Sequence, residues 1–144
     1  MGLAAFQERL GHPFRDPELL QRALTHDSLP NEVQGRRSNE RLEFLGDAVL
    51  ELIVREALFQ AHPDRREGWM TQEKRRLVRN DALAQLGAAL GVDEVLEMGR
   101  GQAQRGLSDA IRADTFEALL GAVFLDDSYE AAKAVALRHL DLTT

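Results

Sequence analysis

The sequence predicts an all-α fold, a compact bundle of about six or seven helices in a single domain over residues 1–144. Almost every apolar segment repeats with the period of a helix, and no segment alternates as a half-buried strand would. The length of 144 residues is typical of one domain, and the chain contains no low-complexity stretch or internal repeat.

Start and stop signals divide the chain into helices. Asp16-Pro17-Glu18 combines an N-cap residue, proline at the first helical position and an acid in the first turn, which predicts a helix over 16–24. His62-Pro63 and Gly91 are stop signals for two later helices. Further helices are expected over 38–60, 71–79, 81–90, 108–125 and 128–140. Loops are expected over the glycine-containing polar stretches 30–37 and 98–108.

Composition excludes several classes of site. There is no cysteine, so disulfides and thiolate-bound zinc are excluded. The four histidines are scattered, and therefore a bound metal is expected to have oxygen ligands. The first ten residues do not resemble a secretory signal, and no apolar run reaches the ~18 residues of a membrane span, so we expect a cytoplasmic protein without membrane contact.

The net charge of −6 argues against a nucleic-acid partner, because phosphate binding depends on basic residues. This objection weakens if several acidic side chains converge on bound cations, since those carboxylates would then no longer repel phosphate.

Acidic residues follow helical spacing in two apolar segments. Glu40, Glu43 and Asp47 fall within roughly 60° of one another on one helix, and Asp114 and Glu117 share a face of a later helix. Both helices are apolar around most of their circumference, so we expect them to be largely buried. Buried like charges repel and are costly to desolvate, and a divalent cation would compensate them.

Oxygen ligands of this kind suit Mg²⁺ or Mn²⁺, and such a site fits phosphodiester hydrolysis. The pattern alone leaves open a solvated acidic face or structural ion pairs. Gly46 lies inside the first acidic segment, where glycine costs about 1 kcal/mol relative to alanine. We therefore expect another helix to approach the backbone closely at this position.

The same segments resemble the ribonuclease III family. Asn39–Leu50 is similar to the family's signature, and Ala113–Asp126 to its second catalytic motif. Ala23-Leu24-Thr25-His26 and Arg66-Glu67-Gly68 also fit, so the resemblance covers nearly the whole chain.

This resemblance implies an endonuclease domain that cuts double-stranded RNA, with Mg²⁺ as cofactor, Mn²⁺ able to substitute, and no nucleotide cofactor. It implies a homodimer whose two sites cut opposite strands and leave 5′-phosphate ends and short 3′ overhangs. Ribosomal precursor maturation is the usual work of the family, although messenger RNA turnover is an alternative. The metal ligands implied are Glu43, Asp47, Asp114 and Glu117, and Asp47 and Glu117 are the residues expected to be indispensable. Glu40 and Glu67 match supporting acidic positions, with a plain surface role as the alternative for Glu67.

The chain departs from the family in two places. The segment Gly99–Gly106 has glutamine where the family usually has an acid after a glycine. Most bacterial members continue into a double-stranded-RNA-binding domain, whereas this chain stops at Thr144. We expect a catalytic domain alone, although a naturally short member is the alternative.

Basic residues offer candidate phosphate contacts at Arg36, Arg37, Lys74 and Arg75, each of which could also be an ordinary solvated residue. We expect weak sequence preference and steeply salt-dependent binding, because A-form RNA is recognised by its shape and backbone. His26 beside Asp27 is interpreted as a capping or core residue and not as part of an HD-type phosphohydrolase site. Two other functions stay open, an all-α nucleotide pyrophosphohydrolase and a non-catalytic RNA-binding relative.

Overall fold

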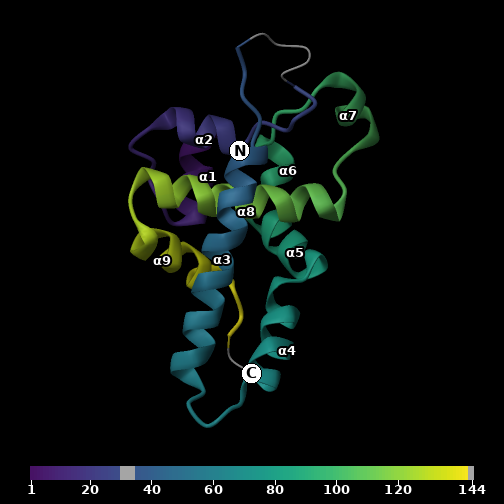
Figure 1. The fold of residues 1–144 in the computed structure, drawn as a ribbon. Helices are drawn as coiled ribbons and strands as arrows, with labels where there is room; N and C mark the ends of the chain where they lie inside the picture. The colour runs from purple at the N-terminus through teal and green to yellow at the C-terminus, as the bar shows by residue number, and fades with distance from the viewer. Residues whose placement is uncertain (30–34, 143–144) are drawn as a thin grey trace.

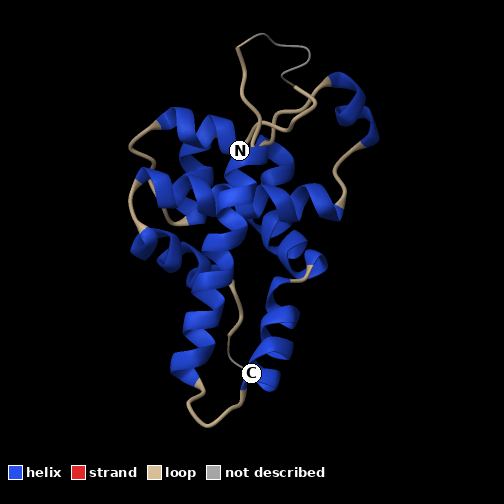
Figure 2. Ribbon diagram, in the orientation of Figure 1, coloured by secondary structure: helices blue, strands red, loops and turns tan. Residues whose placement is uncertain are grey.

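The computed structural model describes residues 1–29 and 35–142, and within them the fold is all-α, as predicted. Its helices are α1 (Leu3–Leu10), α2 (Pro17–Ala23), α3 (Glu40–Ala61), α4 (Glu67–Val78), α5 (Asn80–Leu90), α6 (Val92–Val95), α7 (Arg100–Arg105), α8 (Asp109–Asp126) and α9 (Tyr129–His139). The described residues contain no strand, only an isolated parallel bridge between Thr25 and Glu97 (Figures 1 and 2). None of the described helices is both long and apolar enough to cross a membrane.

Helix α8 is the centre of the bundle. Its buried positions run without interruption from Thr115 to Val123, so it is covered on all sides. Figure 1 shows α8 lying across α3, with α2 and α9 near one end and α5 near the other. The helix is therefore packed from several directions, and side chains on its surface are held in fixed positions.

The crossing of α3 and α8 depends on two glycines. A Cβ atom placed on Gly46 would lie 1.7 Å from the carbonyl oxygen of Glu117, and one on Gly121 would lie 2.3 Å from that of Leu42. Both distances are far below van der Waals contact. The two backbones therefore touch at a point where no other residue type fits, which confirms the close helix approach predicted for Gly46.

The predicted helix starts are confirmed at Asp16, Ser108 and Ser128. The side chain of each accepts a hydrogen bond from a backbone N–H in the first turn, at 3.0, 3.2 and 3.0 Å respectively. Gly91 ends α5 in the left-handed conformation, with φ of 87°. These local signals are strong because they satisfy backbone groups that a helix end leaves unpaired.

The carboxylate of Asp126, at the end of α8, holds the loop between α1 and α2. It accepts hydrogen bonds from the backbone N–H groups of Arg15 and Asp16, at 2.9 and 2.8 Å, and lies 2.8 Å from Nε2 of His12. These three partners explain why the second acidic motif ends in aspartate. The N-terminal part of the chain is thereby tied to the central helix.

Several boundaries differ from the prediction. Helix α1 was not predicted, because Gly2 at its N-cap makes no side-chain cap that could reveal the start. Helix α4 begins at Glu67 and not at 71, and α7 occupies part of the segment predicted as a loop over 98–108. Of the loop predicted over 30–37, residues 30–34 lie outside the described residues. The short helix α6 was not predicted either, and α1, α6 and α7 together account for the larger number of helices.

The expectation that α3 is largely buried was wrong. One side of the helix packs on the core, but Phe44, Leu52 and Phe59 are 84%, 55% and 70% exposed. Asp47 and Ala48 are exposed on the same helix. The sequence shows that a helix is apolar on two sides, but it does not show whether both sides are covered within one chain.

Replacing Gly46 by alanine tests the crossing. The added methyl group must push α8 away, so we expect the free energy of unfolding to fall by about 3 kcal/mol, despite alanine's better helix propensity. Thermal unfolding should show a decrease of roughly 10 °C. Gly68→Ala is the matched control, because no atom lies within 4 Å of its Cβ position in α4, and we expect it to be neutral or slightly stabilising. Equal behaviour of the two variants would contradict the role assigned to Gly46.

Candidate metal centre

The helix crossing brings the four carboxylates predicted as metal ligands together. Glu43 and Asp47 lie one turn apart on α3, and Asp114 and Glu117 lie on α8. Glu43 shares a hydrogen bond with Asp114, and Glu117 shares one with Asp47. The cluster therefore consists of two carboxyl pairs, each made by one residue from either helix.

Burial and mutual repulsion disturb the ionisation of these groups. Glu117 is only 8% exposed. This burial, and then the neighbouring carboxylate of Asp47, raise the pKa of Glu117 to about 9. Burial, and then the charge of Asp114, raise the pKa of Glu43 to about 7. Burial also raises the pKa of Asp114. The raised pKa values of Glu43 and Glu117 favour their protonated forms when no cation is bound.

A divalent cation fits this donor set. None of the contributions to the shifted pKa values of Glu43 and Glu117 comes from lysine, arginine or histidine, so among the described residues their charge is not balanced by a basic side chain. The ligands are all carboxylate oxygens, which Mg²⁺ and Mn²⁺ prefer. No group of three acidic or histidine side chains in the described ranges is already arranged around a common point. Binding would therefore replace the shared protons and draw the two pairs together.

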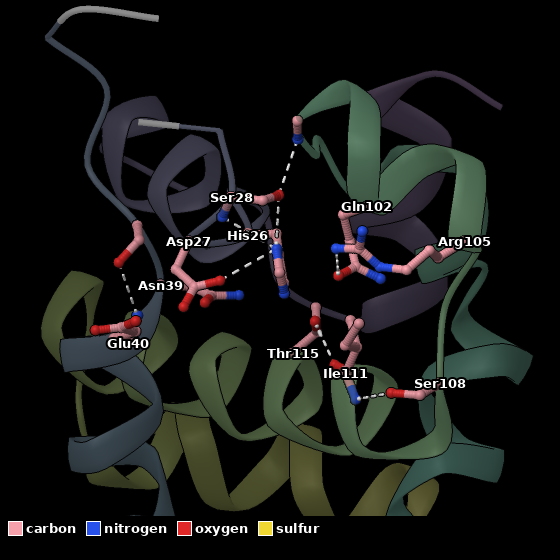
Figure 3. Close-up of polar contacts among 12 residues, drawn as sticks. His26, Asp27, Ser28, Asn39, Glu40, Gln102, Arg105, Ser108, Ile111 and Thr115 are labelled. Atoms are coloured by element: carbon pink, nitrogen blue, oxygen red, sulfur yellow. Dashed lines mark hydrogen bonds and ion pairs between the residues drawn. The ribbon is translucent and has the colours of Figure 1, made fainter. Parts of the chain in front are cut away.

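The cluster is open to solvent on two sides. One hollow is lined by Glu43 and Asp114 together with the further residues His26, Asp27, Asn39, Glu40, Ile111 and Thr115. The second is lined by Glu43, Asp47 and Glu117 with Glu40, Phe44, Leu45 and Ala48. Figure 3 shows the first hollow, with His26 and Asp27 on one wall and residues of α8 below. A substrate can thus approach the carboxylates from outside the bundle.

Comparison with known proteins agrees with this geometry. Residues 16–142 match the profile of the Ribonuclease-III-like family. The chain belongs to the ribonuclease III family. It is 45% identical over 138 residues to Ribonuclease 3 of Dinoroseobacter shibae and 40% identical over 136 residues to that of Bdellovibrio bacteriovorus. These matches cover 94% and 92% of this chain, but only 59% and 58% of the two relatives.

Solved structures show the same fold. The nuclease domain of ribonuclease III from Campylobacter jejuni is 34% identical, with a TM-score of 0.88 over 95% of this chain and 94% of that domain. Dicer from Giardia intestinalis is 28% identical, with a TM-score of 0.75 over 95% of this chain and 18% of Dicer. The resemblance stated from the two acidic motifs is therefore confirmed at the level of family and fold.

The two supporting acids predicted from the family resemblance lie in different places. Glu40 begins α3 and borders both hollows, and a hydrogen bond with Asp27 raises its pKa. Glu67 begins α4, where its carboxylate accepts a hydrogen bond from Thr71 at 2.8 Å. Within this chain Glu67 lines another hollow, with Phe59 and others, and is not brought to the carboxylate cluster.

The predicted phosphate contacts divide into two groups. Arg36 donates to Glu97 at 3.0 and 3.1 Å and to Thr25 at 2.8 Å, so its guanidinium has protein partners. Lys74 likewise pairs with Glu51 at 3.3 Å. Arg37 and Arg75 are exposed. The structure thus leaves these last two residues as the more accessible candidates.

Besides His26 and the apolar Ile111, three residues of the first hollow were not foreseen as part of the site. Asp27, Asn39 and Thr115 line it beside the expected carboxylates. Asn39 and Thr115 lie inside the two motifs, but the direction of their side chains depends on the packing of α2 and α8. His26, interpreted as a capping or core residue, is only partly buried and also faces this hollow.

Magnesium should stabilise the protein through these carboxylates. A ligand that binds only the folded state, at a concentration tenfold above its dissociation constant, raises the free energy of unfolding by about 1.4 kcal/mol. This corresponds to a rise of roughly 3–5 °C in Tm. We expect this rise in the unaltered protein and its loss in the Asp47→Asn/Glu117→Gln double variant. Asp64→Asn, which removes an exposed carboxylate from the turn after α3, should keep it. An equal rise in the double variant would place the bound ion elsewhere.

Proposed function

We propose that this protein is a divalent-metal-dependent endoribonuclease that hydrolyses phosphodiester bonds of double-stranded RNA. The products would have 5′-phosphate ends and short 3′ overhangs, and the physiological role would be RNA processing such as ribosomal precursor maturation. The observation that carries the proposal is the cluster of four carboxylates at the crossing of α3 and α8. It is partly buried and open to solvent, and no lysine or arginine among the described residues contributes to the shifted pKa values of Glu43, Asp114 and Glu117.

The four carboxylates have distinct environments that suit distinct tasks. Glu43, Asp47, Asp114 and Glu117 would hold Mg²⁺, with Mn²⁺ able to substitute. The bound metal would supply an activated water and stabilise charge on the phosphate and the leaving oxygen. Glu117 is fixed deep in the core by α8, whereas Asp47 is exposed on α3. This arrangement lets Glu117 set the position of the site while Asp47 faces the substrate.

The substrate class follows from family membership together with the openness of the site. Relatives named Ribonuclease 3 span the motifs that contain all four carboxylates, and this chain covers a little over half their length. Asp27 and Glu40 make the edges of the site acidic, so the metal and arginines such as Arg37 and Arg75 must attract the RNA backbone. Nucleotide pyrophosphate hydrolysis is the competing enzymatic activity. It would be supported only if the protein hydrolysed nucleotides and did not cleave RNA.

We also propose that the protein acts as a homodimer. Phe44, Ala48, Leu52 and Phe59 fall within about 80° of one another around α3, and all except Ala48 are large apolar side chains exposed by more than half. An exposed apolar stripe of this kind, interrupted here by Arg55, marks a protein interface. The Campylobacter jejuni nuclease domain is described as having a region involved in dimer formation. In a two-fold dimer, this stripe would pack against its own copy.

Substitution of the carboxylates tests the catalytic proposal. We expect Asp47→Asn and Glu117→Gln each to reduce cleavage of an end-labelled RNA duplex in Mg²⁺ by at least about a thousandfold, because several kcal/mol of transition-state stabilisation depend on the metal. Asp64→Asn should cleave at the normal rate. Chelation should abolish cleavage, and cuts on the two strands should be staggered. Full activity of Asp47→Asn would overturn the assigned mechanism, whereas nucleotide hydrolysis without RNA cleavage would favour the pyrophosphohydrolase.

Substitution of the apolar stripe tests the dimer. We expect the Phe44→Asp/Leu52→Asp double variant to sediment as a monomer at concentrations where the unaltered protein sediments as a dimer. The two aspartates would be desolvated and would face their own copies across a two-fold interface. Leu3→Asp is a matched control, because Leu3 is also an exposed leucine but lies on α1. A control that dissociates equally would place the interface elsewhere.

A further inference from the structure

His26 lies on the wall of the hollow that also contains Glu43 and Asp114. It follows α2 and is held there by its backbone, since its N–H donates to the carbonyl of Glu97 at 2.9 Å. The flanking residue Thr25 accepts from the N–H of Asn39 at 2.9 Å, which ties the same segment to the start of α3. The imidazole is therefore presented from a backbone clamped on both sides.

Polar groups of Ser28 and Asp27 surround Nδ1 of His26 and orient the ring. The backbone N–H of Ser28 donates to Nδ1 at 3.1 Å. The hydroxyl of Ser28 accepts from the N–H of Gly99 at 2.9 Å and lies 2.8 Å from Nδ1. Asp27 lies 3.2 Å from the same nitrogen. An imidazole that accepts from Ser28 at Nδ1 has its proton on Nε2, which takes part in none of these contacts.

The Nε2–H group faces the hollow. Figure 3 shows the far edge of the His26 ring directed away from Ser28, toward the space beside Thr115 and Ile111. No hydrogen bond to Nε2 is formed by the described residues. The amide of Asn39 donates one of its two protons to the carbonyl of Ala23 at 3.1 Å, and the hydroxyl of Thr115 donates to that of Ile111 at 2.7 Å.

The groups around Nε2–H are mainly acceptors. Asp27 and Glu40, which are not among the proposed metal ligands, line the same hollow, so a phosphate oxygen at Nε2–H would lie beside acidic groups that no metal neutralises. A hydroxyl group fits better, because it can accept from Nε2–H while donating to a carboxylate. On an RNA strand, the ribose 2′-hydroxyl is the neutral group that both donates and accepts.

We propose that Nε2–H of His26 binds a ribose 2′-hydroxyl of the RNA next to the Glu43–Asp114 pair, and that this contact makes the site prefer RNA over DNA. The proposal rests on the endoribonuclease function proposed above. It assigns to His26 a substrate contact for selectivity and no role in holding the metal. Ser28 is a positioning residue, because it contacts only Nδ1 and would act through the orientation of the imidazole.

Two amide substitutions separate this contact from a merely structural role. In His26→Gln the side-chain amide reaches the position of Nε2, whereas in His26→Asn it reaches only that of Nδ1. We expect His26→Asn to lower kcat/KM for an RNA duplex by roughly tenfold, the value of one hydrogen bond of this kind, and His26→Gln to lower it by only about threefold. The reverse order, with asparagine the better substitute, would mean that the bond to Ser28 is what matters and would overturn the proposal.

Duplexes with single 2′-deoxynucleotides identify the partner of His26. When a single deoxynucleotide is placed at each position across the cleavage site in turn, one position should lower kcat/KM of the unaltered protein by about tenfold. The same deoxynucleotide should cause no further loss in His26→Asn. Equal losses in both proteins at every position would overturn the contact. The same substitution at His62, at the far end of α3, should leave the deoxynucleotide scan unchanged. Cleavage by the unaltered protein that depends on Asp47 would uphold the endoribonuclease whichever result is obtained at His26.

Discussion

The contact between the backbones of α3 and α8 at Gly46 and Gly121 determines how the four carboxylates of the proposed metal centre are placed. Each glycine leaves room for a carbonyl of the other helix that no Cβ atom could tolerate. At this separation, carboxylates one turn apart on α3 reach those on α8, and the two pairs form. A crossing wider by a methyl group would move Glu117 away from Asp47, so helix packing and site geometry are a single constraint.

The same packing makes the site electrostatically unfavourable without a cation. Glu117 is held in the core by residues on all sides of α8, and burial beside Asp47 raises its pKa to about 9. Burial and the charge of its partner Asp114 raise the pKa of Glu43 to about 7. A cation bound at the proposed site would remove both penalties, so the energy that the fold loses by burying acids would become affinity for metal. The stability of the bundle and the loading of its site are therefore linked.

The outer surfaces of the two central helices serve different purposes. Helix α8 is buried all round and sets the position of the site. Helix α3 packs on the core with one side, lines the site with a second and exposes Phe44, Leu52 and Phe59 on a third. Because α3 is apolar both on the side that packs on the core and on the side that is exposed, its sequence resembles that of a fully buried helix. The segment containing His26 lines the hollow opposite α8, and contacts of Nδ1 with Ser28 orient its imidazole.

The sequence by itself determined the helical fold, the capped helix starts at Asp16, Ser108 and Ser128, and the pairs of acids on common faces. These features depend on interactions within a few residues, so their spacing reveals them. Only the tertiary structure decided that Glu43 pairs with Asp114, that the outer side of α3 stays exposed, and that His26 and Asp27 face the same hollow. Each of these depends on which surfaces of distant segments meet, and helical periodicity does not contain that information.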